Sequence, residues 1–149
     1  MFKLLFALIF VSIFIHSFLP NTYRYLGPIH WLQHPWLRWT GTGLLILSLL
    51  WTVVAQAQMG ESWRIGIDHE HQTALVMMGV FGFSRNPIFL GMTITLVGLF
   101  VVIPNTLTAL TLLMGVVLIQ IQVRLEEEFL VKTHGEEYCQ YRRQVRRWL

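Results

Sequence analysis

Residues 81–91, Phe-Gly-Phe-Ser-Arg-Asn-Pro-Ile-Phe-Leu-Gly, mark the place where a polar loop gives way to an apolar segment. Pro87 favours a helix start, because the first turn of a helix needs no N–H group from that residue. Arg85 lies two residues earlier, at the mouth of the apolar segment. An arginine at a membrane boundary either anchors lipid headgroups or binds an anion, and both interpretations are open at this point.

Two apolar segments follow, at 87–103 and 106–123, and Pro104-Asn105 joins them. A Pro-Asn pair between apolar segments is typical of a tight turn, so the sequence predicts a C-terminal helical hairpin. Each arm of about 17 residues would span ~26 Å, slightly less than a ~30 Å hydrocarbon core. We therefore expect the hairpin either to cross incompletely or to thin the bilayer around it.

The composition indicates an integral membrane protein. Of the 149 residues, 54% are hydrophobic and 13% are charged, whereas a soluble domain has about 25% charged residues. The apolar run at 2–19 has no small-residue cleavage site, so we expect a retained transmembrane helix rather than a signal peptide. A second span is expected at 37–58. The prediction is an all-α integral membrane fold with about four transmembrane helices in a single domain, 1–149, made of two N-terminal spans (1–58) and a core (59–149).

The chain becomes polar from Arg124 onward and ends in a predicted amphipathic tail helix. One face of this helix would carry Tyr138, Tyr141, Val145 and Trp148, and arginines at 142, 143, 146 and 147 would occupy the remainder. With four spans, nine of the 11 lysines and arginines lie on one side of the membrane, and Arg24 and Arg38 lie on the other. The positive-inside rule then places both termini and the tail helix in the cytoplasm.

Polar residues cluster where the last apolar segment ends. Gln120, Arg124 and Glu127 or Glu128 fall on one helical face. Arg85 emerges at the same surface, since the hairpin returns the chain there, and Tyr138 or Tyr141 could fold over it. Charged groups at a membrane edge are costly unless they pair or face water. The cluster therefore indicates either a polar pocket or a solvated helix with internal ion pairs and a basic, lipid-contacting tail.

The segment Ser84-Arg-Asn-Pro-Ile-Phe-Leu-Gly91 is followed, in order, by Glu126-Glu127, Leu130, Gly135, Tyr138, Tyr141, Val145 and Arg147. These two blocks resemble the isoprenylcysteine carboxyl methyltransferase and phospholipid methyltransferase superfamily. Its pattern is Arg-His-Pro-x-Tyr-x-Gly, then Glu-Glu-x-x-Leu and Gly-x-x-Tyr-x-x-Tyr. The run at 59–66 looks like bacterial members, so we expect a bacterial inner-membrane protein.

The resemblance implies a membrane methyltransferase that uses S-adenosylmethionine without a Rossmann domain. The cofactor would lie at the cytosolic face under the C-terminal tail, and the acceptor would enter from the bilayer. Carried over by position, Arg85 would bind a carboxylate of cofactor or acceptor. Glu126 or Glu127 would orient the cofactor's amine or ribose, or hold an arginine such as Arg64 or Arg124. The implied catalytic residues are Arg85 and Glu127, and the implied cofactor-binding residues are Arg85, Asn86, Pro87, Glu126, Glu127, Tyr138 and Tyr141.

Three positions depart from the superfamily pattern. Asn86 stands where histidine is usual, Phe89 where tyrosine is usual, and His134 where an aromatic residue usually precedes the glycine. Asparagine can donate and accept hydrogen bonds but cannot act as a base near pH 7. A mechanism that depends on an imidazole at this position is therefore not expected.

The acceptor is expected to be lipid-like or small and lipophilic. Carboxyl O-methylation of the isoprenylcysteine type is favoured by resemblance, and N-methylation of a phospholipid amine is the alternative. A different class, a non-catalytic membrane assembly or permeation subunit, predicts no cofactor affinity.

Other candidate sites are weaker. The cluster Asp68-His69-Glu70-His71 matches no strong zinc template, so no metal site is predicted. We expect His30 and His34 to pack at the membrane interface beside tryptophans. The arginine-rich end favours membrane lipids rather than nucleic acid as a partner.

Overall fold

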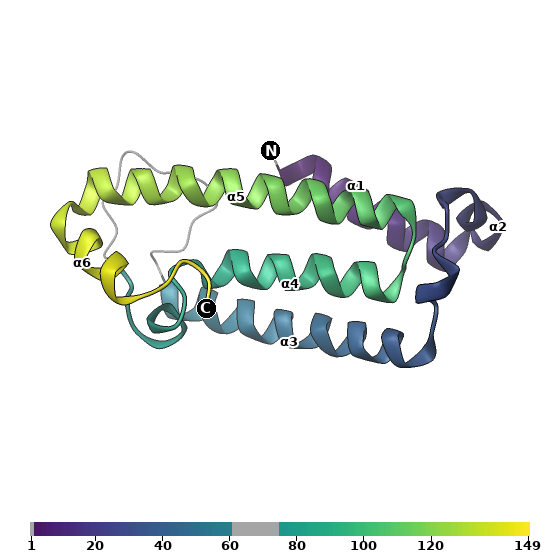
Figure 1. Ribbon diagram of the computed structural model, residues 1–149, viewed down its shortest axis with the longest axis horizontal. Coiled ribbons are helices and arrows are strands. Elements are labelled where there is room, and N and C mark those ends of the chain that lie inside the picture. The colour runs from purple at the N-terminus through teal and green to yellow at the C-terminus, as the bar shows by residue number, and fades with distance from the viewer. Residues whose placement is uncertain (1, 61–74) are drawn as a thin grey trace. The chain divides into compact units, whose positions relative to one another are not determined.

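The computed structural model describes residues 2–60 and 75–149, and every regular element in these ranges is a helix (Figure 1). The prediction of an all-α fold is confirmed. The elements are α1 (Phe2–Phe18), α2 (Pro20–Tyr23), η1 (Arg24–Leu26), η2 (His30–Leu32), α3 (Pro35–Met59), η4 (Gly79–Gly82), α4 (Pro87–Val102), α5 (Thr106–His134) and α6 (Glu136–Gln144).

The chain divides into two compact units. The first consists of Met1–Ser48 and Met92–Ile119, and the second of Leu49–Gly91 and Gln120–Leu149. Each of the helices α3, α4 and α5 contributes one end to each unit. The division into spans 1–58 and a core 59–149 remains a prediction.

Two helices in the described ranges are long and apolar enough to cross a membrane, namely α3 with 25 residues and α5 with 29. The helix α4 is apolar but has only 16 residues, as expected for a short hairpin arm. At the N-terminus, Lys3–Phe18 and Pro20–Leu26 form a pair bent by 119°, which is either a broken span or a re-entrant loop. The membrane character is therefore supported, and the count of four spans remains a prediction.

The structure locates the ends of the last two helices, and the second of them differs from the sequence prediction. The sequence predicts an apolar span to residue 123 and a helical face that continues to Glu127 or Glu128, and the structure extends α5 to His134. This stretch is rich in Leu, Glu and Lys, which are good helix formers, and the first glycine is Gly135, whose φ of 54° ends the helix. The helix α6 ends at Gln144, and Val145 is already extended. Thus Val145 and Trp148 lie beyond the helix that was predicted to carry them.

In the first unit, the beginning of α3 packs against the end of α4 (Figure 1). A Cβ atom added at Gly41 would lie 2.8 Å from a methyl group of Val102 and 3.0 Å from the carbonyl oxygen of Gly98. The Ser48 hydroxyl also lies 2.9 Å from that of Thr95. Small residues thus let these two helices approach closely, as is common between membrane helices.

In the second unit, two contacts position the loop that precedes α4. The indole N–H of Trp51 donates to the carbonyl of Pro87 at 2.9 Å. The side-chain oxygen of Gln58 accepts from the backbone N–H of Val80 at 2.8 Å. Gly79 has a φ of 65° and lies directly against the Gln58 amide, where a Cβ would clash. The end of α3 therefore holds both ends of the 79–87 segment.

Candidate functional site

The loop before α4 is joined to the C-terminal segment by hydrogen bonds to backbone carbonyl groups. The N–H of Arg85 donates to the carbonyl of Arg146 at 3.0 Å. The Ser84 hydroxyl donates to the carbonyl of Arg147 at 3.2 Å, and the Asn86 side-chain amide donates to the same carbonyl at 3.3 Å. Figure 1 shows the C-terminal end, in yellow, returning to this loop. Residues 84–86 and 146–147 thus form one hydrogen-bonded network.

Glu127 of α5 is the centre of this network. Its carboxylate accepts from Arg147 Nη2 at 2.7 Å and Nε at 3.2 Å. It also lies 3.2 Å from Arg85 Nη2 and accepts from Asn86 Nδ2 at 3.3 Å. The Glu127 side chain is only 6% exposed, so a buried anion is matched by two guanidinium groups and an amide.

Arg85 makes a second contact through Nη1, which donates to the carbonyl of Arg142 at 3.3 Å. Its side chain is 8% exposed. The remaining donor, Nε, is buried and has no hydrogen-bond partner among the residues that the structure describes. A buried unpaired donor carries a desolvation cost, so this N–H is available to a ligand oxygen.

Two tyrosines of α6 lie beside this network. Tyr138 and Tyr141 are 1% and 5% exposed, and their rings meet edge to face with centroids 6.0 Å apart. The hydroxyl of Tyr141 donates to the carbonyl of Phe81 at 2.6 Å. Burial, together with the negative charge of Glu127 in the case of Tyr138, raises the pKa of each tyrosine to about 12. Both phenols therefore stay neutral at physiological pH.

The structure brings together most of the residues that the resemblance singled out. Arg85, Asn86 and Glu127 contact one another, and Pro87 is buried at the start of α4. Glu126 is partly buried on α5, and no hydrogen bond of this network involves it in the described part of the chain. The structure does not test the catalytic and cofactor-binding roles of these residues, which stay predictions.

The arginine partner of Glu127 differs from the one expected. Arg124 is exposed, and Arg85 and Arg147 hold the carboxylate instead. Arg64 and the run at 59–66 fall largely outside the described residues, as does the histidine-containing cluster at 68–71.

Arg147 and Ser84 are members of the network that were not among the predicted site residues. The tail arginines were interpreted as lipid contacts, because an arginine-rich amphipathic helix is typical of such contacts. The signal that pointed to Arg147 was its place in the superfamily pattern. Ser84 carried no signal beyond its position before Arg85.

Residues 36–137 match the model of the phospholipid methyltransferase family. A comparison with curated proteins gave no match. The fold is similar to that of a eukaryotic isoprenylcysteine carboxyl methyltransferase, described as an intramembrane Ras methyltransferase, with a TM-score of 0.76 at 22% identity. The match covers 97% of this chain and 50% of the other, so the chain spans about half of that protein's length. At this identity the likeness shows a shared fold.

Proposed function

Since the chain belongs to the phospholipid methyltransferase family, we propose that it transfers a methyl group from S-adenosylmethionine to a lipid-like or small lipophilic acceptor. The observation that carries the proposal is the junction of the 84–86 loop with Glu127 and the C-terminal segment. The two sequence blocks that carry the superfamily resemblance are distant in the chain, and they meet in one buried polar network.

The residues at this network suit the cofactor. Arg85 Nε is a buried donor that a carboxylate or ribose oxygen could occupy. The neighbouring rings of Tyr138 and Tyr141 offer aromatic surface of the kind that contacts adenine and positively charged sulfur. S-adenosylmethionine supplies an activated methyl group on a sulfonium. We assign Arg85, Asn86, Pro87, Glu126, Glu127, Tyr138 and Tyr141 to its binding site.

Within this site, Glu127 acts through the groups it holds. Two guanidinium groups and an amide already occupy its carboxylate, so its role is to fix Arg85 and the C-terminal segment. Asn86 takes the place of the usual histidine and serves as a hydrogen-bond donor to Glu127. The work of these residues is positioning and exclusion of water, which methyl transfer needs more than strong acid–base groups.

This arrangement favours a carboxylate acceptor. A carboxylate can attack the methyl group as the anion, whereas a protonated amine must first lose a proton to a base. Of the two carboxylates assigned to the site, Glu127 is paired with two arginines and Glu126 makes no hydrogen bond to the described residues of the network, and the tyrosines have pKa values of about 12. Carboxyl O-methylation is therefore our first choice, and N-methylation of a phospholipid amine is the alternative.

The charge distribution supports an orientation with the C-terminus in the cytoplasm, whereas placing the N-terminus there rests on the proposed count of four spans, because the N-terminal helix belongs to the other unit. Arg85 and the tail arginines belong to the unit that contains all eight acidic residues and most of the basic ones. By the positive-inside rule this unit faces the cytoplasm, and methyl transfer would occur at the cytoplasmic surface of a bacterial inner membrane.

The decisive experiment measures binding of S-adenosylhomocysteine to the detergent-purified chain by titration calorimetry. We expect saturable binding by the wild type and a loss of at least about tenfold in Arg85→Ala, the scale of a buried charge-assisted hydrogen bond. Arg143→Ala is the matched control, because it removes the same charge from an exposed position of α6. No binding by a folded wild type would favour the non-catalytic alternative.

The acceptor is tested by transfer of a labelled methyl group in reconstituted vesicles. Vesicles would contain either a prenylated cysteine with a free carboxylate or an ethanolamine phospholipid. We expect label in a base-labile methyl ester with the first acceptor. Label only in the phospholipid amine would show that the reaction is N-methylation and not O-methylation. No label in either acceptor would refute both reactions.

A further inference from the structure

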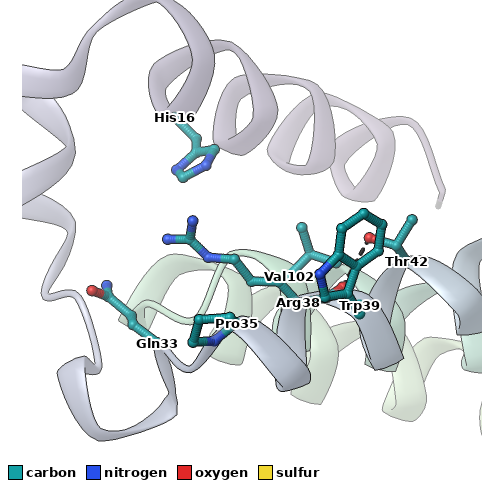
Figure 2. A pocket seen from close by; sticks show the side chains of 7 residues that line it. All are labelled: His16, Gln33, Pro35, Arg38, Trp39, Thr42 and Val102. Atoms are coloured by element: carbon teal, nitrogen blue, oxygen red, sulfur yellow. Dashed lines mark hydrogen bonds between the residues drawn. The ribbon is translucent and has the colours of Figure 1, made fainter.

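The first unit contains a pocket of about 550 Å³ that lies between α1 and the beginning of α3 (Figure 2). The lining residues include His16 of α1, Gln33 from the chain before α3, and Pro35, Arg38, Trp39 and Thr42 from the first turns of α3. In Figure 2 the guanidinium group of Arg38 extends into the space between α1 and α3. The residues of the proposed cofactor site all belong to the other unit.

The charge in this pocket has no carboxylate partner within its own unit. The first unit contains no aspartate or glutamate, since all eight acidic residues of the chain belong to the second unit. Arg38 therefore has no carboxylate of its own unit with which to pair. Arg24, another arginine of this unit, already donates to the Tyr25 hydroxyl at 3.1 Å and stacks on that ring. An arginine at a membrane boundary without a counter-ion needs water or an external anion.

The other polar groups of the pocket add hydrogen-bonding capacity. Gln33 contributes an amide and Trp39 an indole N–H, which is a donor only. His16 is held edge to face against Tyr23, and its buried Nδ1 atom has no hydrogen-bond partner among the described residues. The donors outnumber the acceptors, which is the chemistry of an anion site.

Tryptophans place the pocket at the depth of lipid headgroups. Trp31, Trp36 and Trp39 surround the start of α3, with exposed fractions of 74%, 64% and 79%. Tryptophans that gather at one end of a membrane helix mark the water–lipid interface. The phosphate groups of a bilayer lie at this same level.

We propose that this pocket binds the phosphodiester headgroup of a membrane phospholipid. Arg38 supplies the charge and the paired N–H groups that match phosphate oxygens, and Gln33 and Trp39 complete the donors. A bound lipid would link α1 to α3 through His16 and Arg38. The site is separate from methyl transfer, and it acts by stabilising the folded chain, since a ligand that binds only the folded state raises its stability.

The test measures thermal unfolding of the detergent-purified full chain with added short-chain phosphatidylglycerol. Short-chain diacylglycerol, which has no phosphate, and inorganic phosphate at equal ionic strength are the two comparison ligands. We expect the phospholipid alone to raise the midpoint of unfolding. An equal shift with diacylglycerol would refute recognition of the phosphate, and an equal shift with inorganic phosphate would refute a lipid ligand. Since these comparisons use the wild-type chain, they decide the matter even if a variant fails to fold.

Two variants localise the site. Arg38→Gln should weaken phospholipid binding about tenfold, as expected for loss of a charge-assisted contact. Arg24→Gln, which removes the same charge from the same unit outside the pocket, should change it less than about twofold. Binding of S-adenosylhomocysteine should be unchanged in both variants, which separates this site from the proposed function. Equal affinities for phospholipid in the two variants would overturn the assignment.

Discussion

Replacing Glu127 with glutamine tests the central claim that one buried carboxylate holds both the 84–86 loop and the C-terminal segment. The substitution keeps the size of the side chain but removes its charge. Arg85, whose side chain is 8% exposed, then loses its carboxylate partner. Removal of one partner of a buried ion pair costs about 3–5 kcal/mol, because the other charge is left without compensation.

The structure places the expected loss near the lower end of this range. Arg85 keeps its bond to the Arg142 carbonyl, and a glutamine oxygen can still accept one hydrogen bond. The Arg147 side chain is 37% exposed, so solvent screens its ion pair with Glu127, and this pair contributes about 0–1 kcal/mol to stability. We expect a loss of about 3 kcal/mol. At about 2–4 °C per kcal/mol for a chain of this size, the unfolding midpoint should fall by roughly 6–12 °C.

The assay is thermal unfolding of purified protein in one detergent, with Glu128→Gln as the matched control. Glu128 is the next residue on α5 and is exposed, so Glu128→Gln should change the free energy of unfolding by less than about 0.5 kcal/mol. A double-mutant cycle with Arg147→Ala should give a coupling energy of about 1 kcal/mol. Equal midpoints for Glu127→Gln and Glu128→Gln, together with additive effects in the cycle, would refute the network.

Three further predictions concern packing, a buried hydrogen bond and pH. Gly41→Ala should destabilise the chain by about 1–3 kcal/mol because its Cβ would press on α4, whereas Gly43→Ala, which meets nothing within 4 Å, should be neutral or slightly stabilising in thermal unfolding. Tyr141→Phe should cost about 1–3 kcal/mol, because the carbonyl of Phe81 loses the hydroxyl that donates to it; an unchanged midpoint would contradict that bond. The raised pKa of Tyr138 and of Tyr141, about 12 in the folded chain against 10.0 ordinarily, means that the unfolded chain releases these protons first, so stability should fall as pH rises from 10 to 12. Ultraviolet absorbance of phenolate should show at least two tyrosines that titrate late.

The sequence predicted the helices because their signals are local. Apolar length, Pro87 at a helix start and Pro104-Asn105 at a turn each act within a few residues, and the structure agrees with α4 and its turn. The sequence predicts that the last helix continues past Arg124 to Glu127 or Glu128, but its polar composition does not show where that helix ends. Polarity ends a membrane segment, but a helix continues until a residue such as Gly135 stops it.

The candidate site was predictable only in part. The resemblance placed Arg85, Asn86 and Glu127 in one site, and the structure brings them into contact. The pairing of Glu127 with Arg147 was not predicted, because it requires the chain to leave the helical path after Gln144. Helical periodicity put that arginine on an outer face, and no local pattern encodes a contact between an extended end and a distant helix.

The carbonyl of Arg147 has a consequence for how the tail can vary. Ser84 and Asn86 both donate to this backbone oxygen, and Arg85 donates to that of Arg146. A main-chain oxygen is present whatever side chain stands there, so point substitutions at 146 and 147 should leave these three hydrogen bonds in place. Deletion of residues 146–149 removes the oxygens themselves, and three polar groups of the loop would then each lose an acceptor at once. The length of the C-terminal segment, more than its sequence, should therefore determine whether it stays in contact with the 84–86 loop.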